Sequence, residues 1–176
     1  MHIGIDASRA FVSRSTGTEN YSRNLILALA KIDRKNTYTL YVRNINYQLP
    51  NTKYPKNFKF KVIPFPYLWT QVGLALECLL HPPDVLFIPA HTLPLIRRPG
   101  LKTVVTIHDL GAEFLLAYHQ FPGRLYLNKS TEYAVYHATC LIAVSQSTKK
   151  DLIEKLKADP EKIKVIYEGS SFKSKE

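Results

Sequence analysis

Two histidines and a carboxylate follow apolar runs of the sequence and are candidates for chemistry. His108 and Asp109 come directly after residues 103–107, and His91 comes shortly after residues 85–88. An imidazole beside a carboxylate can donate a hydrogen bond to a sugar hydroxyl or take part in proton transfer. Two plainer alternatives stay open: His108 and Asp109 bond to loop backbone, and His91 is a loop histidine exposed to solvent.

A glycine at the start of a helical pattern offers a second kind of chemistry, the binding of a phosphate. Thr16, Gly17 and Thr18 precede a run of helical period that includes Tyr21. Because glycine has no side chain, backbone N–H groups there can approach a phosphate closely, and the helix dipole stabilises an anion by about 0.3–1 kcal/mol. Glu19 can complement the same dipole, so an ordinary capped helix start is the alternative.

These candidates depend on a fold that brings the ends of strands together. The pattern predicts strands over residues 2–6, 37–42, 58–62, 85–88, 103–107, 140–144 and 163–167, and helices over residues 21–32, 68–80, 124–138 and 145–157. This alternation predicts an α/β fold with a doubly wound, mostly parallel, Rossmann-like sheet. Residues 58–62 alternate apolar and basic side chains, which is typical of an edge strand. In such a sheet ligands bind beyond the carboxyl ends of the strands, where the candidate residues are expected.

The composition is that of one folded domain with a strong positive charge. The chain has 176 residues, of which 45% are hydrophobic and 22% are charged. Its net charge of +10 indicates an anionic partner: nucleic acid, an acidic membrane surface or a phosphorylated small molecule. Cys78 and Cys140 lack the spacing of a zinc site or a redox pair. The sequence shows neither a secretory leader nor an apolar stretch of membrane-spanning length, which predicts a cytoplasmic location.

Two pairs of basic residues and one aromatic stretch are interpreted as parts of the fold and not as parts of a site. Arg97 and Arg98, like Lys149 and Lys150, are expected on solvated faces. Residues 64–69 concentrate aromatic side chains that could touch an acyl chain or a membrane interface, although core packing before the next helix is the favoured interpretation.

Six short motifs in order resemble the amino-terminal half of the family 4 (group 1) glycosyltransferases, which are retaining nucleotide-sugar enzymes of the GT-B fold. The motifs lie at residues 3–7, 16–25, 84–89, 105–110, 142–145 and 160–166. Together they extend over nearly the whole chain. The resemblance implies a single Rossmann-like, acceptor-side domain over residues 1–169, with residues 170–176 beginning an interdomain linker or forming a tail.

The same resemblance implies roles for the candidate residues. His108, with Asp109 beside it, is expected to contact the transferred sugar. The loop formed by Thr16, Gly17 and Thr18 is expected to approach the donor diphosphate. Tyr21 and His91 are expected to face the acceptor cleft. The implied activity is transfer of a hexose from a nucleotide-sugar to a glycan or lipid-linked acceptor in polysaccharide biosynthesis. No metal or other cofactor is expected in a GT-B enzyme.

Two differences from the family pattern affect these expectations. Glu19 and Asn20 stand where many relatives have a second glycine and an arginine. The sequence stops near the point where family members continue into a second, donor-binding domain, so it is expected to be a fragment or half of a split enzyme, inactive alone. Glu168 and Glu176 have the spacing of a glutamate pair in that second domain, and this is interpreted as coincidence.

The alternative function is a non-catalytic, basic Rossmann-like module that binds nucleic acid or an anionic membrane surface. The sequence lacks the patterns of common RNA-binding and helix-turn-helix modules, which disfavours nucleic acid. Peripheral association with the inner face of a membrane is compatible with the leading interpretation, because a lipid-linked acceptor would place a basic surface against anionic headgroups.

Overall fold

A computed structural model describes residues 1–12, 16–43, 54–110 and 123–169. Within these ranges, seven strands form one sheet in the order β3-β2-β1-β4-β5-β6-β7, and every neighbouring pair is parallel. The strands are β1 (His2–Asp6), β2 (Thr37–Val42), β3 (Phe58–Val62), β4 (Val85–Ile88), β5 (Lys102–Ile107), β6 (Cys140–Ala143) and β7 (Ile163–Val165). The predicted parallel α/β sheet is therefore confirmed. The expected linker or tail, residues 170–176, lies outside the described residues.

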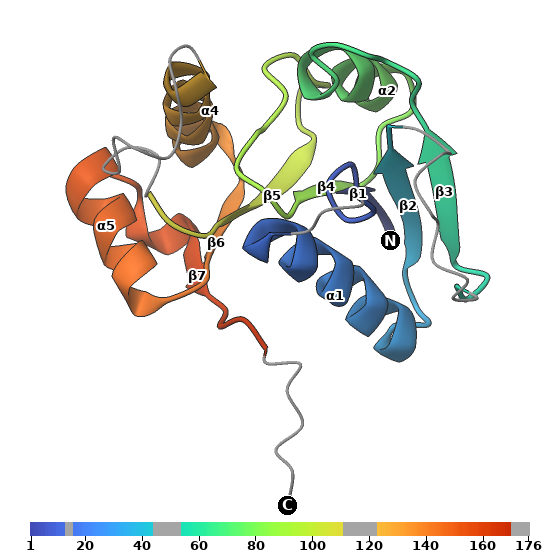
Figure 1. The fold of residues 1–176 in the computed structure, drawn as a ribbon, viewed down its shortest axis with the longest axis horizontal. Helices are drawn as coiled ribbons and strands as arrows, with labels where there is room; N and C mark the ends of the chain where they lie inside the picture. Colours follow the sequence, from blue (N-terminus) through green and yellow to red (C-terminus); the bar gives the residue numbers. More distant parts are fainter. Residues whose placement is uncertain (13–15, 44–53, 111–122, 170–176) are drawn as a thin grey trace, which may run out of the picture.

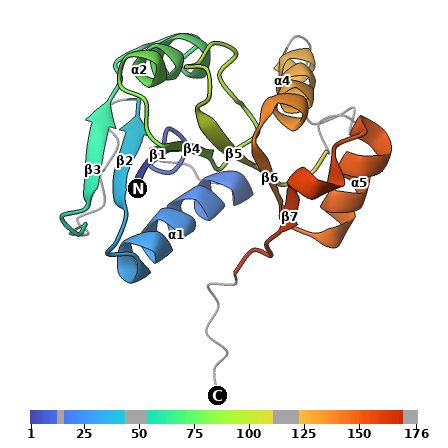
Figure 2. The ribbon, with the colours of Figure 1, turned by 180° about the vertical axis from the view of Figure 1, so that it is seen from behind.

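Helices cover both faces of the sheet (Figures 1 and 2). They are α1 (Gly17–Ile32), η1 (Thr70–Leu74) continuing into α2 (Ala75–Leu80), α4 (Gly123–His137), α5 (Gln146–Leu156) and the short η2 (Pro160–Lys162). α1 lies on one face, and α2 and α4 lie on the other. This is the layering of a doubly wound sheet, because successive right-handed crossovers on the two sides of β1 place their helices on opposite faces.

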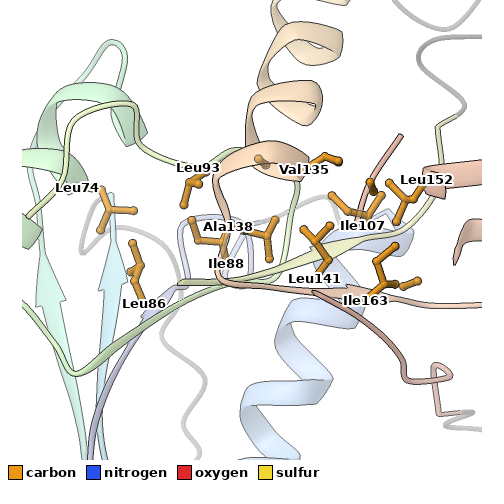
Figure 3. Close-up of a cluster of buried hydrophobic side chains, with 14 of the residues drawn as sticks. Leu74, Leu86, Ile88, Leu93, Ile107, Val135, Ala138, Leu141, Leu152 and Ile163 are labelled. Carbon is orange, nitrogen blue, oxygen red and sulfur yellow. The ribbon is translucent and has the colours of Figure 1, made fainter. Parts of the chain in front are cut away.

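Each face of the sheet has its own apolar cluster. On the α2 and α4 face, Leu86, Ile107 and Leu141 from the strands pack with side chains from α2, α4 and α5 (Figure 3). On the α1 face, Ile26 packs against Ile5 and other strand residues. Burying one such aliphatic side chain stabilises the fold by about 1.5–3 kcal/mol, so these two clusters hold the strand ends in place.

The strand β3 lies at an edge of the sheet, as its alternating sequence predicts. Among the described strands it pairs only with β2. Phe58 is buried, whereas Lys59 is exposed and the Lys61 ammonium lies 2.7 Å from the Glu77 carboxylate. The half-exposed character of this strand follows from its position.

The helix predicted over residues 68–80 begins two residues later in the structure, and its first turn is not α-helical. Leu68 has a φ of 49° and lies outside the helix, and residues 70–74 form a π-helical turn before α2. Gly73 permits this turn to pack tightly, because a Cβ atom there would lie 2.8 Å from Ile63 Cγ2. Trp69 is 1% exposed and its indole N–H donates to the Ile63 carbonyl at 3.0 Å, so this part of the aromatic stretch does pack in the core.

Part of the aromatic stretch and one side of α2 are nevertheless exposed. Leu68, Val72, Leu76 and Leu80 recur every four residues and are between 38% and 64% exposed, and the neighbouring Tyr67 is 80% exposed. We call these five residues the apolar ridge. No helix in the described residues is long and apolar enough to cross a membrane.

The order of the strands reverses between β1 and β4. β2 and β3 lie on one side of β1, and β4 to β7 lie on the other. In open parallel sheets this reversal is where ligands bind, just beyond the carboxyl ends of the two strands. The loops that follow β1 and β4 are therefore the first places to search for a site.

Candidate functional site

His108 emerges from the carboxyl end of β5, the strand next to β4. Its backbone carbonyl accepts a hydrogen bond from the Thr148 hydroxyl at 3.0 Å, and Ser145 caps the same turn of α5. Its ring Nε2 lies 2.9 Å from the Pro89 carbonyl, and its Nδ1 lies 2.8 Å from the Glu168 carboxylate. The imidazole is thus held at both nitrogens, while 11% of the side chain stays accessible.

Tyr21 joins α1 to this strand end. Its ring packs edge-on against the His108 ring with the centroids 4.7 Å apart, and its hydroxyl lies 3.4 Å from Thr106 Oγ1. Burial raises the pKa of the Tyr21 hydroxyl, and the nearby charge of Glu168 acts in the same direction. Tyr21 is therefore neutral at pH 7 and can offer its hydroxyl to a ligand.

His91 follows β4 and lies against His108, with the ring centroids 5.6 Å apart. Its backbone has a φ of 23°, which a non-glycine residue rarely adopts. Its Nδ1 is buried and has no hydrogen-bond partner among the described residues. Burial lowers the pKa of His91 to about 4, and the charge of His108 acts in the same direction. His91 is thus half-buried, and its Nδ1 is not exposed to solvent as a fully solvated loop histidine would be.

The glycine loop begins α1 with a cap made by Glu19. The Glu19 carboxylate accepts from the Thr16 N–H at 2.9 Å and from the Thr16 hydroxyl, and Arg9 Nε donates to it at 2.8 Å. Burial disfavours the charged form of Glu19, but the bonds from Thr16 and Arg9 outweigh this and lower its pKa to about 2. The capped-helix interpretation is therefore confirmed. The Thr16 N–H donates to Glu19, so it is not available to a phosphate.

Gly17 and Thr18 lie at the start of α1, beside open space. They are the first two residues of α1, and the first backbone N–H groups of a helix have no partner within it. A Cβ atom on Gly17 would meet nothing within 4 Å, so the space beside it is open. Tyr21 stands one helical turn further on, which places the start of α1 at the same edge of the sheet as His108.

Asp109 stands beside this group of aromatic rings. It is exposed, and its charge raises the pKa of His91, against the larger lowering by burial and by His108. The structure thus brings Tyr21, His91 and His108 into contact and keeps Asp109 at their margin.

Two acidic residues at this edge were not among the predicted site residues. Glu168 lies three residues past the end of β7 and reaches His108, whereas Glu176, with which it shares the glutamate-pair spacing, lies outside the described residues. Asp6 ends β1 at the strand reversal, where burial raises its pKa although Ser8 and two arginines oppose this. The rule that ligands bind beyond strand ends would have found both. The described residues contain no group of three or more acidic, histidine or cysteine side chains that could hold a metal ion.

Arg97 departs from its expected solvated position. Its guanidinium donates to the Pro94 carbonyl at 2.8 Å, to the Tyr133 hydroxyl at 2.9 Å and to the His137 carbonyl at 3.1 Å. It therefore ties the loop after β4 to the end of α4. Arg98 is exposed, as expected.

Comparison with known proteins shows which family the chain is similar to. The family model described as Glycosyltransferase Family 4 matches residues 15–170. Among solved structures, the crystal structure of WaaG, a glycosyltransferase involved in lipopolysaccharide biosynthesis, matches with a TM-score of 0.63 and 15% sequence identity. That match covers 94% of this chain and 44% of the WaaG chain, so this chain spans less than half of that protein. No curated protein matches the chain.

Proposed function

The chain belongs to glycosyltransferase family 4, and we propose that its described residues are the acceptor-side wall of a retaining, nucleotide-sugar-dependent enzyme of the GT-B type. The observation that carries this proposal is the contact of Tyr21, His91 and His108 at the carboxyl edge of the sheet, close to the strand reversal. The acceptor is a glycan or a lipid-linked sugar, and the transferred group is a hexose.

The start of α1 is proposed to approach the donor diphosphate. The N–H groups of Gly17 and Thr18, which have no partner within the helix, and the positive end of the helix dipole favour an anion there. Glu19 limits this attraction, but its charge is balanced by Arg9. A transfer without metal ion would stabilise the departing diphosphate by such fixed donors and positive charges.

A carboxyl-terminal donor-binding domain is proposed as the partner that completes the site. The chain spans only 44% of the WaaG chain that it matches, which supports a partner of similar size. The test is to measure sugar transfer from several nucleotide-sugars with and without a supplied donor-binding domain. We expect turnover only with both parts, and strong turnover by the 176 residues alone would falsify the proposal of a half-site.

The diphosphate contact is tested by Gly17→Ala in the same transfer reaction. The new methyl group meets no protein atom within 4 Å, so a loss must come from the ligand. We expect kcat/KM for the donor to fall about tenfold, or about 1.4 kcal/mol. Asn24→Ala, on the exposed side of the same helix, is the matched control. Equal activity of both variants would remove Gly17 from the donor site.

A second candidate role is peripheral binding to the inner, cytoplasmic face of a membrane, favoured by the apolar ridge and by the net charge of +10. Vesicle pelleting with anionic and neutral lipids tests it. We expect Leu76→Ser to weaken pelleting with anionic vesicles, and Ile166→Ser, equally exposed but after β7, to leave it unchanged. Retention on nucleic acid that falls steeply with salt would instead favour the nucleic-acid alternative.

A further inference from the structure

The two ring nitrogens of His108 both face oxygen atoms that only accept hydrogen bonds. Nε2 lies 2.9 Å from the Pro89 carbonyl, and Nδ1 lies 2.8 Å from Glu168 Oε1. A neutral imidazole carries one N–H, so it can satisfy only one of these acceptors. Both contacts are hydrogen bonds at the same time only when the ring carries two N–H groups and a positive charge.

We propose that Glu168 is a positioning residue that holds His108 as a fixed imidazolium at the carboxyl edge of the sheet. The part that this pair would play in sugar transfer rests on the proposed function. Pro89 fixes one end of the ring through its backbone, and Glu168 fixes the other through its charge.

The path of the chain explains how Glu168 reaches a residue two strands away. After β7 the backbone continues along β6, where the Ile166 N–H donates to the Ala143 carbonyl at 3.0 Å. β6 in turn pairs with β5, the strand that ends just before His108. The Glu168 side chain, 46% exposed, spans the end of β6 and covers the more deeply placed imidazole.

The groups around His108 are compatible with a single positive charge. His91 is neutral at pH 7, since burial lowers its pKa to about 4, and so it does not repel the imidazolium. Tyr21 is neutral as well, because burial raises its pKa. Asp109, the next residue along the chain, adds a second negative charge nearby, and Arg9 is neutralised by Glu19.

This arrangement changes the role expected of His108. With both nitrogens protonated and bonded, the ring has no lone pair with which to accept a proton. Because Glu168 balances its charge, the ring contributes a fixed position and a polarised edge to the proposed sugar site. Glu168 touches neither the sugar nor the phosphate in this scheme and acts through His108.

The charge state can be measured directly on the full chain by NMR of ¹⁵N-labelled histidine side chains at pH 7. Wild type is expected to show two N–H groups on the His108 ring. Glu168→Gln keeps an acceptor oxygen but loses the charge, and we expect the doubly protonated fraction to fall about threefold or more. Glu161→Gln removes an equal charge from an exposed position at the other end of β7 and is the matched control.

Glu168→Asp, which keeps the charge on a shorter side chain, should restore part of the doubly protonated fraction. A merely structural role for Glu168 would change the unfolding midpoint but not the protonation of His108, so unfolding is measured on all variants. If Glu168→Gln leaves His108 doubly protonated to the same extent as Glu161→Gln does, the inference is overturned.

Sugar transfer with the supplied donor-binding domain gives a second readout. We expect Glu168→Gln to lower kcat about tenfold with little change in the acceptor KM. If Glu168→Gln lowers the doubly protonated fraction of His108 but leaves kcat unchanged, Glu168 has no role in sugar transfer. Absence of transfer by the wild type with every donor would instead count against the proposed function, and the NMR result would still decide whether Glu168 holds the charge.

Discussion

His91 couples the candidate site to the stability of the fold. Its ring is packed against His108 and its Nδ1 is buried, so protonation places a charge in a poorly solvated position, which the nearby charge of Asp109 compensates only in part. Burial lowers its folded-state pKa to about 4, below the value of 6.5 for an unperturbed histidine. The unfolded chain therefore binds more protons than the folded chain between these two values.

We predict that the free energy of unfolding falls as the pH is lowered from about 6.5 to about 4, by at most about 3 kcal/mol from this residue. His91→Asn, which tolerates the positive φ, should lack this part of the pH dependence. Urea unfolding at several pH values measures it. His81→Asn, at an exposed histidine, should keep the slope of the wild type, and loss of the slope there would contradict the assignment.

Glu19 has the opposite dependence, because its folded-state pKa is lowered to about 2. Its stabilising effect is complete above about 4.5, its unfolded value, and is lost as the pH falls toward 2. We predict that Glu19→Gln lowers the unfolding free energy by about 1 kcal/mol at pH 7. Thermal unfolding at several pH values should show that the difference in unfolding free energy between Glu19→Gln and wild type becomes smaller below pH 4.5. A difference that becomes larger there would contradict the stabilising role of the charged Glu19 cap.

A site residue could be predicted when its signal was local in the sequence, and it could not when its contacts join residues that are far apart in the sequence. His91, His108 and Gly17 were found because each follows a strand or begins a helix, and the edge of a parallel sheet collects such positions. The burial of His91 and the contact of Glu168 with His108 depend on side chains from separate strands meeting in space. No local pattern contains that information.

Among the side chains that hold the loop after β4, Arg97 makes several hydrogen bonds. It bonds to its own loop and to the last turn of α4, and its guanidinium also lies 5.7 Å from the Tyr133 ring. Because this loop carries His91, its position bears on the site. A basic residue in a loop gives no sign in sequence that its partners lie on a helix 36 residues away.

We predict that Arg97→Ala lowers the free energy of unfolding by about 1–3 kcal/mol, because it leaves the His137 carbonyl at the end of α4 and the Pro94 carbonyl in the loop without their charged donor. Arg98→Ala, at the exposed neighbouring arginine, should change it by no more than about 0.5 kcal/mol. Denaturant unfolding compares the two variants. Equal effects would mean that the hydrogen bonds of Arg97 contribute nothing.

The helices and strands themselves were largely predictable, with most boundaries displaced by one or two residues and the start of α1 by four. The exception is the π-helical turn at residues 70–74, because apolar periodicity does not distinguish it from an α-helix. Its packing depends on the close approach of Gly73 to Ile63, a tertiary contact. The short β7 also differs, since it ends at residue 165 where its apolar pattern continued to 167.

At the scale of the whole molecule, the parallel sheet with its strand reversal unites all the described elements. The alternation of strands and helices predicted this architecture, but the strand order follows from tertiary packing and was not predicted. Leu141 is fully buried in β6, and packs in the cluster shared by α2, α4 and α5.

We predict that Leu141→Ala lowers the free energy of unfolding by about 2–5 kcal/mol through the lost apolar burial and the cavity left behind. Ile166→Ala, at a side chain that is 52% exposed just past β7, should cost about 0.5 kcal/mol or less. Urea unfolding followed by circular dichroism measures both. A small effect at Leu141 would show that the cluster can collapse around the missing atoms.

The edge strand β3 has a consequence for the behaviour of the molecule in concentrated solution. A strand that ends a sheet offers its outer backbone groups as a template on which another molecule can add a strand. Lys59 and Lys61 place positive charge along this strand, and Glu77 holds the second of them. Like charges on an approaching copy repel, so these lysines protect the protein from self-association, and neutralising them would reduce its solubility before it affected its fold.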